Sequence, residues 1–187
     1  MVSVRDVVPE FHRSDSVPRI VGMDPGFKGG LALLNKDEQR SVNMPVIVSR
    51  KTTTVKGKKK VKVRTNLNEP EIRNFLKIAM PDLVIIEMAS SMPKQGVTSV
   101  FNFGAGWGIL RGICAGMSIP YELVRPQAWK KEILAGTDKD KAAAISHVLR
   151  RFPYVDFEGE QLNDGQADAF CLAEYGLKNY IFTDGDE

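Results

Sequence analysis

Short apolar runs separated by glycine-rich or polar turns mark the expected strands of this chain. Two runs, Arg19–Met23 and Gly30–Asn35, flank the sequence Asp-Pro-Gly-Phe-Lys-Gly-Gly, and a third run covers Arg40–Val46. The glycine turn is typical of a hairpin, so we expect three antiparallel strands. The run Asp82–Glu87 is continuously apolar, as in a buried parallel strand, and Pro120–Val124 predicts one further strand.

Helical periodicity and capping residues predict helices between these strands. Asn68 is expected to cap a helix that ends near Met80, because proline and acidic residues fill its first turn. Further helices are expected at about Val97–Met117, Asp138–Phe152 and Asp164–Lys178. The order of elements predicts a three-layer α/β fold, a mixed five-stranded sheet with helices on both faces.

Glycine recurs every four residues in the helix expected at Val97–Met117, at Gly104, Gly108, Gly112 and Gly116. One face of this helix therefore lacks side chains and allows another backbone to approach closely. We expect most of this face to pack on the sheet. A dimer contact is the alternative.

Charge is unevenly distributed along the 187 residues, whose net charge is only +3. Eight basic residues and no acid lie between Arg50 and Arg64, which predicts a protruding basic hairpin at about 48–66 that contacts phosphates. A solvated lysine-rich loop without a partner is the alternative. We expect a flexible arm at 1–18, one globular domain at 19–178 and an acidic tail at 179–187.

Cysteine usage and hydropathy indicate the compartment. Cys114 and Cys171 lie in apolar helical stretches, and two cysteines with two histidines build neither a zinc site of the usual spacing nor a disulfide framework. No apolar run approaches the roughly 18 residues of a membrane helix. We therefore expect a reducing, cytoplasmic location without membrane contact, with an organelle as the alternative.

Four carboxylates carry the chemistry that the sequence predicts. Asp24 and Glu87 each end an apolar run, while Asp164 and Asp168 share one helical face. Clustered acids raise one another's pKa, so a fold that gathers them needs a cation, and oxygen ligands suit Mg²⁺ or Mn²⁺. This pattern predicts a metal-dependent nuclease. Individually, Asp24 could be an ordinary turn residue and Asp164 an N-cap.

Together these motifs resemble the RuvC family of Holliday-junction resolvases in the RNase H-like superfamily, closest to its phage and chloroplast branches. The matching segments lie between Arg19 and Leu177 and are Val21–Gly26, Val84–Glu87, Trp129-Lys130, Asp140-Lys141 and Asp164–Gly176. The resemblance implies an RNase H-like fold that holds two Mg²⁺ ions, for which Mn²⁺ substitutes. The implied metal ligands are Asp24, Glu87, Asp164 and Asp168.

Two departures from the family pattern are visible. The final acids are four residues apart rather than three, with Gly165 at the three-residue position. The aromatic residue that opens the junction in bacterial resolvases is missing after Glu87, where this chain has Met88-Ala89-Ser90-Ser91. We expect Met92, Phe101, Phe103 or the basic hairpin to open the junction instead.

The resemblance also implies a mechanism and partners. Two-metal hydrolysis would cut a four-way DNA junction by paired symmetric nicks that leave 5′-phosphate and 3′-hydroxyl ends. Paired nicks imply a homodimer. Lys130 and Lys141 match basic positions near the scissile phosphate, although ordinary surface lysines are the alternative. The expected DNA-binding residues are Lys28, Lys51, Lys56, Lys58, Lys59, Lys60, Lys62, Arg64, Lys94, Lys130 and Lys131.

Other functions remain open at this stage. A nuclease of the same fold could act on forks, flaps or RNA–DNA hybrids. A non-catalytic junction-binding protein would not need four acids. A sugar-kinase-type phosphotransferase would use the glycine turn as a phosphate loop, but this chain is too short for the second domain.

Overall fold

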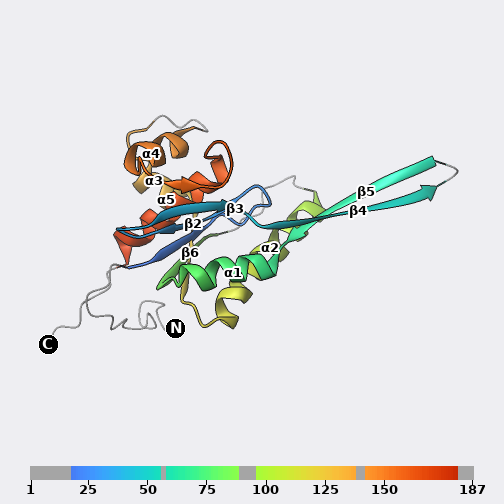
Figure 1. Ribbon diagram of the computed structural model, residues 1–187, viewed down its shortest axis with the longest axis horizontal. Coiled ribbons are helices and arrows are strands. Elements are labelled where there is room, and N and C mark those ends of the chain that lie inside the picture. Colours follow the sequence, from blue (N-terminus) through green and yellow to red (C-terminus); the bar gives the residue numbers. More distant parts are fainter. Residues whose placement is uncertain (1–17, 56–57, 89–95, 138–141, 181–187) are drawn as a thin grey trace.

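The structure is a computed structural model that describes residues 18–55, 58–88, 96–137 and 142–180 (Figure 1). Almost all of the expected N-terminal arm and most of the acidic tail lie outside these ranges. None of the described helices is long and apolar enough to cross a membrane.

The central sheet combines antiparallel and parallel strands. Its first three strands form two successive hairpins, as predicted, and β6 then pairs parallel to β1. The strand order is β7-β6-β1-β2-β3-β8. The strands are β1 (Ile20–Met23), β2 (Gly30–Leu34), β3 (Gln39–Asn43), β6 (Leu83–Glu87), β7 (Tyr121–Val124) and β8 (Asp156–Phe157).

Helices cover both faces of this sheet and bury two apolar cores. The helices are α1 (Glu69–Ala79), α2 (Val97–Gly116), α3 (Pro126–Ile133), α4 (Ala143–Arg151) and α5 (Asp164–Asn179). One core joins Ile20 and Ile85 to Trp129 of α3 and Phe170 of α5, and the other joins the opposite face of the sheet to α1 and α2. Figure 1 shows these two layers on either side of the strands. The predicted three-layer α/β fold is confirmed.

Some predicted boundaries and elements were wrong. The structure adds the two-residue strand β8 at the sheet edge and the helix α3, which follows Arg125 with proline in its first turn. The third strand ends at Asn43, because Pro45 has no N–H to continue the ladder, and Val46 begins the next strand. The helix expected from Asp138 begins at Ala143, and residues 138–141 lie outside the described ranges.

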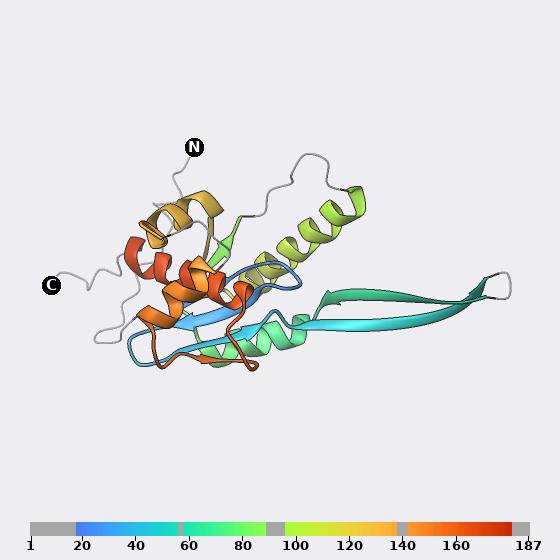
Figure 2. The ribbon, with the colours of Figure 1, turned by 90° about the horizontal axis from the view of Figure 1, so that it is seen from above.

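The predicted basic hairpin is present and longer than expected. Strands β4 (Val46–Val55) and β5 (Lys58–Leu67) pair antiparallel over their whole length and form a sheet of their own. At about 3.3 Å per residue, ten residues span roughly 30 Å. Figures 1 and 2 show this ribbon projecting well beyond the domain body. It is anchored at its base, where Leu67 is buried and approaches Gly106 of α2.

The glycine face of α2 does not pack on the sheet, so that prediction was wrong. A Cβ atom placed on Gly104, Gly108, Gly112 or Gly116 would meet nothing within 4 Å. The opposite face of the helix, with Leu110 and Cys114, is the buried one. The sheet therefore receives the larger apolar side chains, and the small residues face outward.

Candidate active site

Two of the predicted acids meet at the carboxyl ends of adjacent parallel strands. The β1–β6 register pairs Met23 with Ile86, so Asp24 and Glu87 follow at neighbouring positions. Such strands lie about 4.8 Å apart. Because side chains alternate along a strand and Met23 and Ile86 belong to the core under α1 and α2, both acids point to the opposite face, toward α3 and α5.

Helix α5 brings Asp168 to this position by a close approach to the β1–β2 hairpin. A Cβ on Gly22 would collide with the Ala169 carbonyl oxygen, and Gly29 and Gly165 form a direct backbone bridge. A side chain at position 165 would overlap the backbone of the turn. The four-residue spacing of the acids therefore has a steric reason, since no carboxylate fits at the three-residue position.

Asp164 lies at the rim of the acidic cluster. Asp164 is the first residue of α5, and the residue before it, Asn163, is the N-cap. The Asn163 side chain accepts a hydrogen bond from the Gln166 N–H as part of a capping box. The N-cap interpretation of Asp164 is therefore wrong. Asp164 is exposed. Its charge raises the pKa of Asp168 but does not contribute to the pKa shift of Asp24 or Glu87.

Burial raises the pKa of the three clustered acids, and repulsion from neighbouring carboxylates adds to the shift of Asp24 and Asp168. Burial, followed by the charges of Glu87 and Asp168, raises the pKa of Asp24 to about 7. The pKa of Asp168 rises to about 6, chiefly through burial, although Lys130 lowers it. Burial also raises the pKa of Glu87. The charge of Glu87 therefore raises the pKa of both Asp24 and Asp168, which couples the three acids.

Helix α3 supplies the groups that contact these acids. Lys130 Nζ lies 3.8 Å from Asp168 Oδ2 and lowers the pKa of all three carboxyl groups. Trp129 is fully buried, and its Nε1 donates to Glu87 Oε2 at 2.8 Å. From the sequence, Trp129 is expected only as part of the segment that matches the family, and the contact with Glu87 is not predicted. The sequence feature that could have indicated a role for Trp129 is its position directly before Lys130.

The oxygen donors of this cluster suit a divalent cation, although the side chains do not form a complete coordination site. No group of three or more histidine, cysteine, aspartate or glutamate residues in the described ranges is arranged to hold a metal ion as it stands. Three carboxylates with raised pKa values are nevertheless hard oxygen donors that a cation would stabilise in their charged form. Trp129 contacts one oxygen of Glu87 and Lys130 one oxygen of Asp168, so each carboxylate has a second oxygen that could bind a cation.

The other predicted residues divide by position. Lys28 lies exposed in the turn after Asp24, and Lys131 is exposed on α3. Lys51, Lys59, Lys60, Lys62 and Arg64 lie exposed on the hairpin; Lys58 is also in β5, but its side chain is outside the description. Lys56, Met92, Lys94 and Lys141 lie outside the described residues.

Two cavities are lined by residues that directly follow an acid in the chain. One of about 680 Å³ begins at Met88, directly after Glu87, and includes Arg125, Gln127 and Lys131 of the α3 segment. A smaller cavity of about 190 Å³ begins at Pro25, directly after Asp24. Neither cavity is lined by Asp24, Glu87 or Asp168, and each includes the residue that follows one of these acids in the chain.

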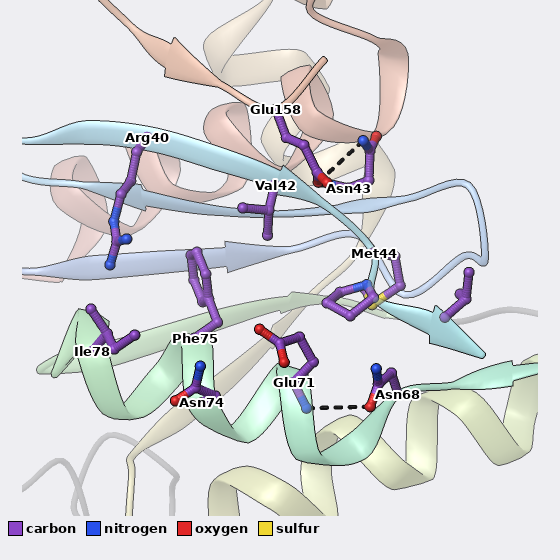
Figure 3. Close-up of a pocket in the computed structure, with 12 residues that line it drawn as sticks. Arg40, Val42, Asn43, Met44, Asn68, Glu71, Asn74, Phe75, Ile78 and Glu158 are labelled. Carbon is purple, nitrogen blue, oxygen red and sulfur yellow. Dashed lines mark hydrogen bonds between the residues drawn. The ribbon is translucent and has the colours of Figure 1, made fainter.

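A third cavity, of about 510 Å³, is separate from the acids and lies between β3 and α1 (Figure 3). The Arg40 guanidinium lies 5.3 Å from the centre of the Phe75 ring in this cavity, and Glu158 accepts from the Asn43 N–H at 2.8 Å. None of Asp24, Glu87, Asp164 and Asp168 lines it.

Known structures share this architecture. No family model and no curated protein matches the chain. RuvC from Thermus thermophilus aligns over 83% of this chain and 90% of its own, with 16% identity and a TM-score of 0.50. The same protein in complex with a Holliday junction substrate aligns over equal shares, with 15% identity and a TM-score of 0.52. This chain has a RuvC-like fold.

A further similar structure is the yeast mitochondrial Holliday junction resolvase Ydc2. It has 12% identity and a TM-score of 0.48, and the alignment covers 94% of this chain and 86% of that chain. The fold expected from the motifs is thus confirmed by the two Thermus structures, while identities near 15% limit that likeness to the fold.

Proposed function

We propose that this protein is a structure-selective endonuclease that resolves four-way DNA junctions, of the phage and chloroplast type. The observation that carries the proposal is the convergence of Asp24, Glu87 and Asp168 at one edge of a RuvC-like sheet, with raised pKa values. A structural role does not require three half-buried acids that repel one another.

Asp24, Glu87 and Asp168, with Asp164 at the rim, are the residues that would hold two Mg²⁺ ions, or Mn²⁺ as a substitute. When bound, these ions would supply an activated water and charge stabilisation for the leaving 3′-oxygen, so that hydrolysis would give 5′-phosphate and 3′-hydroxyl ends. Binding them requires the carboxylates to close around the charge. Asp24 is central to the set because both other clustered acids raise its pKa.

Helix α3 orients the acids and receives the phosphate in this proposal. The buried Trp129 indole holds Glu87 toward the cluster through one oxygen. The Lys130 side chain is half exposed, so its ammonium can neutralise a scissile phosphate as well as Asp168. Lys141 would add a second positive charge, as the resemblance implies.

The hairpin carries its charges mainly on one face. Directly paired residues of an antiparallel ribbon share a face, and the register pairs Lys51 with Lys62, Thr53 with Lys60 and Ser49 with Arg64. Arg50 and Lys59 belong to the other face, whose remaining members are uncharged: Val46, Val48, Thr52, Thr54, Val61, Val63, Thr65 and Leu67. We infer that the face with Lys51, Lys60, Lys62 and Arg64 follows the phosphates of one duplex arm.

The remaining basic residues near the acids would extend this DNA contact. Lys28 lies in the turn after Asp24, and Lys131 lines the cavity next to Met88 together with Arg125. Lys94 belongs to the same expected set. Lys28 thus lies on the turn that follows Asp24, and Lys131 directly follows Lys130 on α3.

A homodimer through the outward face of α2 fits paired cleavage. Residues at the helical spacing that forms this face are all exposed, and apart from Phe101 they are glycine or alanine: Gly104, Ala105, Gly108, Gly112, Ala115 and Gly116. Small residues let two helices approach closely, and a two-fold axis then presents two identical active sites. The exposed Phe101 ring, at 73%, would be covered by the partner.

Replacing Gly108 by Arg should therefore separate the dimer. We expect at least about a tenfold rise in the dimer dissociation constant in sedimentation equilibrium, because a long charged side chain blocks the close approach. Leu149→Arg on the exposed side of α4 is the control and should remain dimeric. A dimeric Gly108→Arg protein would rule out this interface.

The function is tested by offering purified protein with Mg²⁺ or Mn²⁺ to four-way junctions, forks, flaps, linear duplex and RNA–DNA hybrids. We expect paired symmetric nicks in junctions at least about tenfold faster than cleavage of the other substrates. Preferred cleavage of forks, flaps or hybrids would support the alternative nuclease. Tight junction binding without cleavage under either ion would indicate a non-catalytic binding protein.

A further inference from the structure

The small cavity beside Asp24 lies between the β1–β2 turn and the first half of α2. Pro25, Phe27, Asn102 and Phe103 line it, and its volume is about 190 Å³. The turn and the helix are held against each other there, because the Pro25 carbonyl oxygen would lie 3.9 Å from a Cβ placed on Gly106. The cavity therefore lies on the α2 side of the turn that follows Asp24.

Two aromatic rings of this cavity are left open to solvent. Phe27 is 39% exposed and Phe103 is 36% exposed. No stacking contact between these two rings is found in the described part of the chain. Exposed aromatic surface beside a functional cluster is typical of a binding site.

The polar lining of the cavity comes from one neutral amide. Asn102 is exposed, and its side chain has no hydrogen-bond partner among the described residues. It offers one acceptor and two donors, the combination that pairs with the edge of a nucleobase. Because no cation lines this cavity, a phosphate group is a poor occupant. A flat, uncharged group with a polar edge fits best.

We propose that this cavity holds one unstacked nucleobase of the nucleotide next to the scissile phosphate. Phe27 and Phe103 contact the faces of the base, and Asn102 reads its edge. The inference rests on the proposed junction cleavage and deepens it, because it assigns the preference for a cut sequence to three residues.

Such a site favours junctions over linear duplex for an energetic reason. Taking a base out of a duplex costs unstacking and unpairing energy, and the cost is lowest where pairing is already disturbed. The centre of a four-way junction offers such bases next to the cut. Stacking on aromatic rings then recovers part of the cost.

The test combines cleavage with a direct probe of base stacking. Junctions carry each of the four bases next to the cut, and nick positions are mapped for wild type, Phe27→Ala, Phe103→Ala and Asn102→Ala. In a parallel series without divalent ions, 2-aminopurine at this position reports unstacking by its fluorescence. Phe103→Leu keeps the apolar volume if the alanine variant does not fold, and Tyr154→Ala, an aromatic residue that is 92% exposed elsewhere, is the control.

We expect the phenylalanine variants to cut about 5- to 100-fold more slowly and to lose the fluorescence rise, as for the loss of one stacked base. Asn102→Ala should cut all four junctions at similar rates, while Tyr154→Ala should match wild type. A wild-type base preference or fluorescence rise that persists in all of these cavity variants overturns the cavity proposal alone. A wild-type protein that cuts no junction overturns the proposed function.

Discussion

Asp24→Asn is expected to abolish junction cleavage, with a loss of at least about a thousandfold in the single-turnover rate. Asp24 is the acid whose pKa both Glu87 and Asp168 raise, so it occupies the centre of the carboxylate cluster. The amide keeps the shape of the side chain but cannot supply the negative charge that holds a cation. Junction affinity should change by less than about twofold, because phosphate contacts supply it.

The same substitution should stabilise the ion-free protein at alkaline pH. The pKa of Asp24 is about 7 in the folded protein against 3.8 as the ordinary value, so the folded state binds this proton more tightly than the unfolded state. This contribution to stability is complete below about pH 4 and is lost as pH rises through 7. Asparagine has no proton to lose, so it avoids that loss.

At pH 8 without divalent ions, we expect Asp24→Asn to unfold with a free energy higher by on the order of 2 kcal/mol. Its midpoint in thermal unfolding should be about 4–8 °C above wild type. The difference should vanish at pH 4, and Mg²⁺ should raise the midpoint of wild type more than that of the variant. Asp156→Asn on the exposed start of β8 is the control.

Two results would contradict this account. A fully active Asp24→Asn enzyme would exclude the acidic cluster as the site of cleavage. Equal stability of variant and wild type at every pH would show that Asp24 carries no electrostatic cost in the folded protein.

Neutralising one face of the hairpin should weaken junction binding far more than neutralising the other. Lys51→Gln, Lys60→Gln and Lys62→Gln together remove three charges from the face that also carries Arg64. If each lysine contacts a phosphate, the slope of log affinity against log salt falls by about 2–3. We expect about 10- to 100-fold weaker binding near 150 mM salt, measured by fluorescence anisotropy.

A control of equal charge comes from the other face. Lys36→Gln, Arg50→Gln and Lys59→Gln together also remove three charges, but Arg50 and Lys59 lie on the opposite face and Lys36 in an exposed turn of the body. This variant should keep the wild-type salt slope to within about one unit. An equal loss of affinity in the two variants would show that net charge, rather than one face of the ribbon, attracts DNA.

Local sequence signals were sufficient for most of the elements. Apolar runs located β1, β2 and β6, and Asn68 capped α1 as its neighbours in sequence predict. These elements depend on residues that are close in the chain, so the local sequence is sufficient to predict them. Helix α3 was not predicted, because eight residues are too few to show a clear helical periodicity. Its two buried residues, Trp129 and Ile133, are only one turn apart.

The acids could also be chosen from sequence, because a carboxylate that ends a buried strand has few structural reasons to be there. The residues that contact these acids could not be predicted from sequence. The hydrogen bond from Trp129 to Glu87 joins residues 42 positions apart and exists because α3 docks beside α5. Likewise, the cavity between Phe27 and Phe103 exists because α2 crosses the turn after Asp24.

Sequence by itself thus determined the fold class and the set of candidate acids, since both follow from hydrophobic periodicity and from charges that burial makes costly. Tertiary structure alone decided that the glycine face of α2 points outward, and that Gly165 leaves no room for a carboxylate. Periodicity shows that a helix has two unlike faces. Which face meets the sheet depends on the packing of larger side chains such as Leu110, a long-range choice that no local pattern contains.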